Sequence, residues 1–374
     1  LRNAGFDGFR VILFQQHGLS QAGEEAGVKI DADFMLALLM SFVLADLVND
    51  IAYQIRPYEV QRGATDEALA MSIEELHGLV LQRVAAVRQE PGLRWLENLP
   101  GSEPLRVGLR LRRYLHGRDL TAALDRIARR FGQIAVDRTQ TRPIVKTTGE
   151  FWAQTTEGDG NFGMLGFLES EGAEVVADPV SAWLPFSVHQ ARVKARDRLT
   201  FSADFWPRLE TLARLIAVDR LYASEWRRLR RHMGNMPRLL PDQIKLRKLA
   251  DPFFNYRSGG GEGHLEVGKN IYYHTRRMCH MVLSLKPFGC LPSTQSDGAQ
   301  SAVACHYDEM IYLPIETSGE GEVNAHSRVQ MALSDARSRA RIERDYALAW
   351  SGVTLDEVRA HVAQNPSLQQ AAYR

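Results

Sequence analysis

One cysteine stands where its chemistry could be used. The chain has three cysteines in 374 residues, and Cys290 follows an apolar run and precedes a helix-like segment in residues 286–301, KPFGCLPSTQSDGAQS. The free N–H groups and positive dipole end of a helix N-terminus favour a thiolate, which is both a nucleophile and a metal ligand. The alternative is a small residue that packs under a turn. Cys290 is therefore a candidate metal ligand, and the alternative interpretation is a residue with a packing role only.

The three cysteines are predicted to lie too far apart to share one metal centre. Cys279 lies 11 residues before Cys290 across an extended strand, on the order of 30 Å at about 3.3 Å per residue. Cys305 lies 15 residues after Cys290, near the far end of the next helix, and so roughly 10–15 Å away. Each is followed by a histidine, but sequence neighbours point apart on strands and helices. We therefore predict that Cys279 and Cys305 are structural.

A glycine-rich loop raises a second chemistry. Residues 158–163, GDGNFG, match G-x-G-x-x-G, and Asp178 stands 20 residues after Gly158, as in a dinucleotide-binding fingerprint. That fingerprint needs its first glycine directly after a strand, whereas residues 149–157 intervene here. A tight loop around another ligand, or turn geometry alone, explains the glycines as well. A nucleotide-binding enzyme that uses the Gly158 loop stays an alternative.

The elements that must position these residues alternate between strands and helices. Apolar runs predict strands at residues 9–14, 143–148, 174–177, 281–285 and 310–315. Helical spacing predicts helices at residues 32–55, 66–89, 119–136 and 163–170, a mostly helical insertion at 182–272, a helix ending near Tyr307 and a long final helix. This alternation predicts an α/β fold with a parallel sheet.

Three polar, glycine-containing loops follow predicted strands: TTGEFWAQTTEGDGN, KPFGCLPSTQSDGAQ and ETSGEGEVN. Parallel strands bring such loops to one carboxyl edge, where open α/β sheets bind ligands. The candidate catalytic residues there are Glu150, Glu157 and Ser293. The candidate substrate- or cofactor-binding residues are Gly158, Asp159, Gly160, Asn161, Asp297, Glu316, Ser318 and Asn324, beside Cys290 as the metal ligand.

Composition narrows the function classes. Lys and Arg number 46 and Asp and Glu 45, so no net field favours nucleic acid or an anionic membrane. Few cysteines fit a reducing compartment, and we expect a cytoplasmic protein. The most apolar segment, residues 34–48, carries Asp46 and is shorter than the roughly 20 residues of a bilayer span, so it predicts a buried helix and no membrane partner. The arginine-rich residues 227–248 predict either a solvated helix face or a contact with cofactor phosphates.

Several of these motifs, in this order, resemble one family. KPFGC followed by PS and SDG, together with GEFW, TTEGDGN and ETSG, resembles the 2-hydroxyacyl-CoA dehydratase component family. The likeness is greatest to its long CoA-substrate-specific activase and activase-related proteins. AGFDGFRV, EEAG and IRPYEV near the start resemble the same group, so the resemblance spans most of the chain.

The resemblance implies two flavodoxin-like α/β lobes that hold a [4Fe–4S]-type cluster on cysteines between them. It implies an acyl-CoA substrate, an ATP-dependent activator as partner, and a radical lyase reaction carried out as part of a larger protein. Cys290 matches a cluster ligand of the family, but residues 1–278 contain no cysteine. Further ligands are therefore expected outside this sequence or are absent.

The predicted organisation is a truncated first lobe with a helical bundle at 1–140, a second lobe at 141–350 with the insertion at 182–272, and a tail at 351–374. Because the chain starts inside a βα pattern, we expect a fragment of a longer protein. The sequence favours an iron–sulfur, electron-transfer and acyl-CoA-handling component. The alternatives are a cluster-free scaffold lobe that docks an activator, or the nucleotide-binding enzyme above.

Overall fold

The structure is a computed structural model in two compact units. It describes residues 5, 32–89, 113–156, 158–199, 205–258, 261–318 and 321–372. Residues 1–45 and 73–123 form the helical unit, and residues 46–72 and 124–374 form the sheet unit. All candidate site residues belong to the sheet unit. Glu157 and the strand predicted at residues 9–14 lie outside the described residues.

A buried arginine organises the helical unit, to which α2 (Ala32–Ile55), α3 (Ala64–Gln89) and α6 (Arg118–Gly132) contribute. Arg83 of α3 pairs with Asp119 at 2.6 Å. Its guanidinium also donates hydrogen bonds to the carbonyl oxygens of Arg113, Tyr114 and His116. Arg83 thus satisfies carbonyl groups of the segment that leads into α6.

Helix α2 is apolar enough to raise the question of a membrane. Within the described part of the chain, Phe34–Tyr58 is the one helical stretch whose length and composition would suffice to cross a bilayer. Half of its most apolar window is buried inside the protein. Its Asp46 accepts hydrogen bonds from the backbone amides of Val180 and Ser181 at 2.9 and 2.7 Å. These contacts are typical of a core helix.

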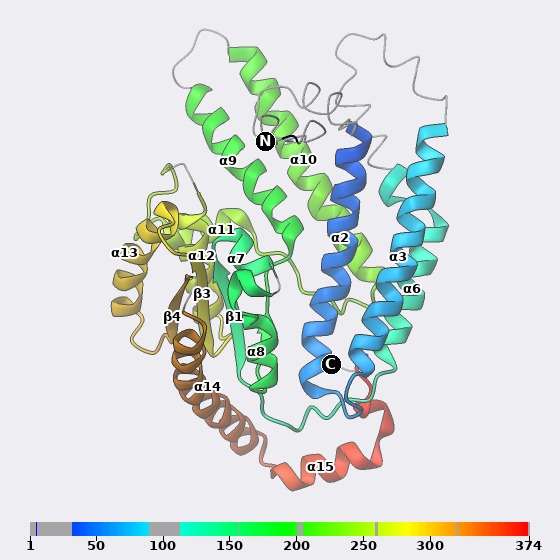
Figure 1. Ribbon diagram of the computed structural model, residues 1–374, viewed down its shortest axis with the longest axis vertical. Coiled ribbons are helices and arrows are strands. Elements are labelled where there is room, and N and C mark those ends of the chain that lie inside the picture. The colour runs from blue at the N-terminus through cyan, green and yellow to red at the C-terminus, as the bar shows by residue number, and fades with distance from the viewer. Residues whose placement is uncertain are drawn as a thin grey trace. The chain divides into compact units, whose positions relative to one another are not determined.

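The sheet unit contains a four-stranded, all-parallel sheet (Figure 1). Its strands are β1 (Ile144–Gly149), β2 (Glu174–Val176), β3 (Met281–Pro287) and β4 (Tyr312–Thr317), in the spatial order β2-β1-β3-β4. The chain first adds β2 on one side of β1 and then returns to the other side for β3. The direction of winding therefore changes between β1 and β3, which is where open α/β sheets bind ligands.

Helices make every connection between these strands. Between β1 and β2 lie α7 (Phe151–Thr155), η3 (Asp159–Asn161) and α8 (Met164–Ser170). Between β2 and β3 lie η4 (Val180–Ala182), α9 (Trp183–Leu199), α10 (Phe205–His232), α11 (Gln243–Ala250) and α12 (Gly263–Thr275). The remaining helices are α13 (Leu291–His306) before β4, then α14 (Glu322–Ser351), α15 (Leu355–Gln364) and η5 (Pro366–Gln369) after it. Helices α9 and α10 lie side by side (Figure 1).

The two faces of the sheet differ in chemistry. On the apolar face, Val145 and Leu283 belong to a buried core that also contains residues of α8 and α14. On the polar face, Lys146, Ser284 and Lys286 are buried and make polar contacts to residues of α12, of α13 and of the segment after β2. Alternate residues of a strand point to opposite faces, so MVLSLKP in β3 supplies both.

The predicted elements are confirmed with small shifts. The four strands predicted between residues 143 and 315 correspond to β1–β4, and α2 has the predicted bounds. Helix α6 ends at Gly132, short of the predicted residue 136, because Val136 forms an antiparallel bridge with Glu59 instead. The loop predicted after β1 contains the unpredicted helix α7. The insertion is helical as predicted, and its last helix, α12, packs on the sheet.

Candidate functional site

The carboxyl ends of β1 and β3 meet closely. The amide of Glu150, directly after β1, donates a hydrogen bond to the Leu285 carbonyl oxygen at 2.9 Å. Gly149 has a φ of +114°, and a side chain there would overlap the Leu285 backbone. Glu150 is the N-cap of α7, and its carboxylate accepts a hydrogen bond from the Ala153 amide at 3.0 Å. The glycine thus lets the two strands approach while the glutamate starts a helix over them.

Cys290 is the N-cap of α13, at the carboxyl end of β3. The thiol is partly exposed and makes no capping hydrogen bond. The buried hydroxyl of Ser293, one turn into the helix, donates to the Cys290 Sγ at 3.4 Å. The structure therefore joins two candidate residues, a thiol and a hydroxyl, at one helix N-terminus.

The Gly158 loop lies after α7 and not directly after β1, as the intervening residues predict. Its backbone is folded on itself, because the Asn161 and Gly163 amides donate to the Gly158 carbonyl oxygen at 3.2 and 2.8 Å. The buried Asn161 side chain donates to the carbonyl oxygens of Ala153 and Thr156. Asp159 and Gly160 belong to the single 3-10 turn between them. Asn161 thereby fixes the loop to the end of α7.

The loop after β4 approaches the Gly158 loop. The Nε2 of His326, in α14, lies 2.9 Å from the Phe162 carbonyl oxygen, and the imidazole ring stacks on Phe167. A side chain added at Gly321 would meet Ser318 and the Phe162 ring at about 3.4 Å. The exposed candidates Glu316 and Asn324 flank this loop, at the end of β4 and in the first turn of α14. These candidates therefore gather on the side of α8 and α14.

Asp297 lies on the other side of the sheet. It forms an ion pair with the buried Lys286 and accepts a hydrogen bond from the Tyr312 hydroxyl at 3.3 Å. Glu266 of α12 lies 3.9 Å from the same Lys286 ammonium, and it accepts 2.5 Å hydrogen bonds from the hydroxyl groups of Ser284 and Ser296. Asp297 is thus part of an ionic network beneath β3.

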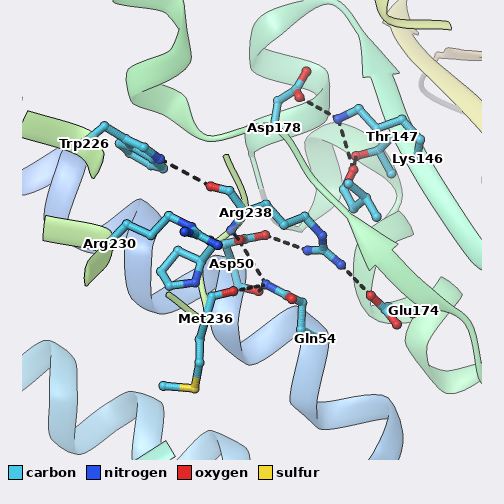
Figure 2. A network of polar contacts seen from close by, with 12 residues as sticks. Asp50, Gln54, Lys146, Thr147, Glu174, Asp178, Trp226, Arg230, Met236 and Arg238 are labelled. Carbon is cyan, nitrogen blue, oxygen red and sulfur yellow. Dashed lines mark hydrogen bonds and ion pairs between the residues drawn. The ribbon is translucent and has the colours of Figure 1, made fainter. Parts of the chain in front are cut away.

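A second buried ionic cluster lies beneath β1. Asp178, just after β2, pairs with Lys146 at 2.6 Å and also with Lys269 of α12 (Figure 2 shows the Lys146 pair). Burial lowers the pKa of Lys146 to about 8, although the Asp178 charge opposes this shift. Burial also opposes ionisation of Asp178, but the two lysines hold its pKa below the ordinary value. Asp178, which matches the spacing of a dinucleotide-binding fingerprint, is paired with two ammonium groups.

A small pocket opens above this second cluster. Its lining comes from α7, the segment after β2, α9, the start of α11 and α12, and consists of Phe151, Gln154, Asp178, Pro179, Ala182, Trp183, Leu240, Pro241, Gln243, Glu262, Leu265 and Lys269. The Trp183 indole Nε1 donates to the Glu262 carboxylate at 2.9 Å. Burial raises the pKa of Glu262 to about 7, helped by the charges of Glu150 and Asp178 and opposed by Lys269 and the Trp183 hydrogen bond. A carboxyl group that titrates near neutral pH in a pocket is a candidate proton donor or acceptor.

The chain just before Glu262 lies against the Cys290 helix. A side chain added at Gly261, next to Glu262, would overlap Pro292 in the first turn of α13. Two apolar neighbours of Cys290, Phe288 and Leu291, are 74% and 76% exposed. The carboxyl edge therefore combines a thiol, a titratable carboxyl group and exposed apolar side chains.

The arginine-rich segment has partners within the protein, one of them the first residue of β2. Arg238 bridges Asp50 at 2.6 Å and Glu174 of β2 at 2.5 Å, as Figure 2 shows. Its backbone amide also donates to Asp50, and the Arg230 guanidinium donates to the Pro237 carbonyl oxygen. These contacts make Arg238 a clamp between α2 and the sheet. Part of the predicted basic face is therefore structural.

Three cysteines in this arrangement do not fit an iron–sulfur cluster by themselves. Cys279 precedes β3, at the opposite end of that strand from Cys290, and burial raises its pKa to about 12. Cys305 is exposed near the C-terminal end of α13. Among the residues that the structure describes, no group of three His, Cys, Asp or Glu side chains could hold a metal ion. Fe–S clusters generally need several thiolates, and this chain brings one to the carboxyl edge.

Sequence reasoning missed Gln154, Trp183, Glu262 and the buried lysines. Lys146 and Lys286 carried a signal, since each interrupts an apolar strand in IVKTTG and MVLSLKP. Glu262 carried none, because its partner Trp183 is 79 residues away.

No family model, curated protein or solved structure matches this chain.

Proposed function

We propose that this chain is the acyl-CoA-handling component of a 2-hydroxyacyl-CoA dehydratase-like or activase-related protein. In this proposal, residues 141–350 form a flavodoxin-like lobe, because β2-β1-β3-β4 is the order of the first four strands in that fold. The observation that carries the proposal is that three of the motifs shared with this family lie at the same edge of the sheet. GEFW follows β1, KPFGC ends β3, and ETSG ends β4, all at the carboxyl edge.

The chain's own residues suit the handling of a thioester substrate. Exposed apolar side chains at the edge, including Trp152 at 69% exposure, offer contacts to an acyl chain. Glu150 and Ser293 are the candidate polar contacts, and Glu262 adds a group that exchanges a proton near neutral pH. Cys290 would contribute one ligand to a [4Fe–4S]-type cluster whose other ligands come from outside this sequence.

Binding measurements on the chain test this proposal. We expect calorimetric titration to detect binding of a 2-hydroxyacyl-CoA and no binding of NAD. Trp152→Ser at the carboxyl edge should weaken acyl-CoA binding several-fold. Trp350→Ser, which removes an indole that is 91% exposed near the end of α14, should leave it unchanged. Binding of NAD without acyl-CoA would instead favour the nucleotide-binding alternative at the Gly158 loop.

The cluster needs a test of its own. Purified anaerobically with iron and sulfide, the chain alone should hold little iron. In a longer protein that supplies further thiolates, Cys290→Ser should lower the iron content, and Cys305→Ser should not. Equal iron in both variants would leave Cys290 as a packing residue.

Exposed apolar residues favour a second candidate, a cluster-free scaffold lobe that docks an ATP-dependent activator. Large exposed apolar side chains that gather in one region often mark a contact surface. If docking is the function, Phe288→Ser with Leu291→Ser should abolish binding of a purified activator, and acyl-CoA should not bind the unaltered chain.

A further inference from the structure

Glu262 has one free carboxylate oxygen at the pocket between α7, α9 and α12. Its other oxygen accepts a hydrogen bond from the Trp183 indole Nε1 at 2.9 Å. The Lys269 charge also acts on this carboxylate, and all three residues line the pocket. The free oxygen has no hydrogen-bond partner in the described part of the chain, and it keeps some accessible surface. A hydrogen-bond donor from solvent can therefore reach it.

Two aromatic rings stand beside this carboxylate. Trp183 and Phe151 both line the pocket, with their ring centroids 6.2 Å apart and their planes tilted by 52°. Trp183 is 49% exposed, so part of its ring is accessible. The face of an indole attracts a cation within about 6 Å of its centre, and aromatic rings also pack against alkyl groups. A carboxylate beside an accessible indole is a combination that suits an organic cation.

The charges around the pocket do not cancel when Glu262 is ionised. Asp178 is paired with Lys146 and Lys269. Glu262 and Glu150 form no ion pair within the described ranges, so these carboxylates and ammonium groups leave a net charge of −1. Burial raises the pKa of Glu262 to about 7, and the charges of Glu150 and Asp178 add to the shift. A cation bound at this carboxylate would lower that pKa again and release a proton.

The size of the pocket selects the kind of cation. It offers about 20 Å³, which is enough for about one water molecule. A primary ammonium group is about as large as a water molecule and donates three hydrogen bonds. Quaternary ammonium and guanidinium groups are larger. A metal ion is a poor fit, because among the described side chains no group of three His, Cys, Asp or Glu could hold one.

We propose that this pocket binds the primary ammonium group of a small alkylamine. The ammonium group donates to the free Glu262 oxygen beside the Trp183 ring, and the alkyl chain packs on the accessible part of that ring. The proposal does not depend on the acyl-CoA function, since it needs neither a thioester nor Cys290.

Calorimetric titration of the chain with butylammonium chloride tests the proposal. We expect weak, millimolar binding, since the ligand has few atoms. Binding should be several-fold tighter at about pH 7.5 than at about pH 6, because Glu262 ionises between them while the ligand stays charged. At about pH 6.5, titrations in two buffers with different heats of ionisation should show that binding releases a proton.

Two variants locate the site. Glu262→Gln should weaken binding about tenfold and abolish the proton release, since the charge-assisted hydrogen bond is lost. Trp183→Leu should weaken binding through loss of the ring face. Glu357→Gln and Trp350→Leu are the matched controls, because each alters an exposed residue of the same type outside the pocket lining. Both should bind butylammonium as the unaltered chain does.

Two further ligands test the unaltered chain, so the answer does not depend on how well a variant folds. Butanol has the same alkyl chain without the charge, and tetramethylammonium has the charge without N–H groups and with greater bulk. Both should bind at least about tenfold more weakly than butylammonium.

Three results would overturn the proposal. If butylammonium does not bind, the pocket is not an ammonium site, and the proposed acyl-CoA function is unaffected. Equal affinity in Glu262→Gln would place the cation elsewhere. Equal affinity for tetramethylammonium would mean that the exposed aromatic rings bind cations without the pocket.

Discussion

The two faces of one sheet in this protein are built on opposite principles. The apolar face buries Leu283 and Leu285 of β3 in a continuous apolar core with α8 and α14. One residue further along the same strand, Ser284 and Lys286 point into an ionic network with Glu266 of α12. Burial of apolar side chains on the first face stabilises the fold. On the second face, burial of charged groups costs free energy, and ion pairs and hydrogen bonds must offset that cost.

The difference indicates where function is expected. A buried ionic network is weak evidence for stability, because well-packed apolar residues often do as well. Both ionic clusters nevertheless lie on the polar face, and the Asp178 cluster forms the floor of the pocket beside Glu262. We infer that the apolar face holds the fold together and that the polar face positions charge for the site. This division is testable one residue at a time.

The largest effect is expected on the polar face. Lys286→Met keeps most of the unbranched side chain but leaves the buried Glu266 and the partly buried Asp297 without their ammonium partner. Breaking a buried pair in this way costs about 3–5 kcal/mol, which urea unfolding would measure. Adding Glu266→Gln to the variant should recover part of the loss. A double variant as unstable as the single one would contradict the pairing argument.

On the apolar face, Leu283→Ala should cost about 2–5 kcal/mol through lost burial and the cavity left behind. Leu283 is fully buried in the apolar core. No ionisable group loses a partner, so the loss should be nearly the same at every pH at which the protein is folded. A loss that changes strongly with pH would mean that the two faces are coupled.

A pair of glycines separates backbone strain from close packing at the carboxyl edge. Gly149 and Gly158 have similar φ values, +114° and +110°, but only Gly149 has a neighbouring backbone that a side chain would strike. Gly158→Ala should cost about 1 kcal/mol from the unfavourable backbone conformation. Gly149→Ala should cost more, and it should also weaken ligand binding by separating β1 from β3. Equal unfolding free energies in the two variants would show that the strands adjust freely.

The fold was predictable because its signals are local. Apolar runs marked all four strands of the sheet, and Gly172, with a φ of +81°, ends α8 where the sequence predicted. The parallel sheet then placed Glu150 and Cys290 at the same edge without any knowledge of side-chain contacts.

The candidate site was less predictable because its contacts are distant in sequence. Asp297 was predicted at the edge as a ligand group, and its carboxylate forms an ion pair with Lys286 near the carboxyl end of β3. Glu262 gains its raised pKa from burial, which depends on how α9 and α12 pack and not on neighbouring letters. Strand positions follow from periodicity, whereas the ionisation of a buried group follows from the whole fold.

The last prediction concerns the Glu262 carboxyl group and tests whether the pH dependence of stability arises on the polar face. The pKa of Glu262 is raised from 4.5 to about 7 in the folded protein. Its contribution to stability is therefore fully present below pH 4.5 and is lost as the pH rises through 7. Glu262→Gln cannot ionise, so between acidic pH and about pH 8 it should gain about 1–2 kcal/mol relative to the unaltered protein, after allowance for solvent screening. Glu357→Gln is the control, because the Thr354 hydrogen bonds lower the pKa of this exposed carboxyl group, so that its contribution to stability is lost only as the pH falls below 4.5. In urea unfolding above pH 4.5, Glu357→Gln should therefore keep the pH dependence of the unaltered protein. If Glu262→Gln leaves the pH dependence unchanged, Glu262 is not the neutral-range group, and the polar side loses its titratable centre.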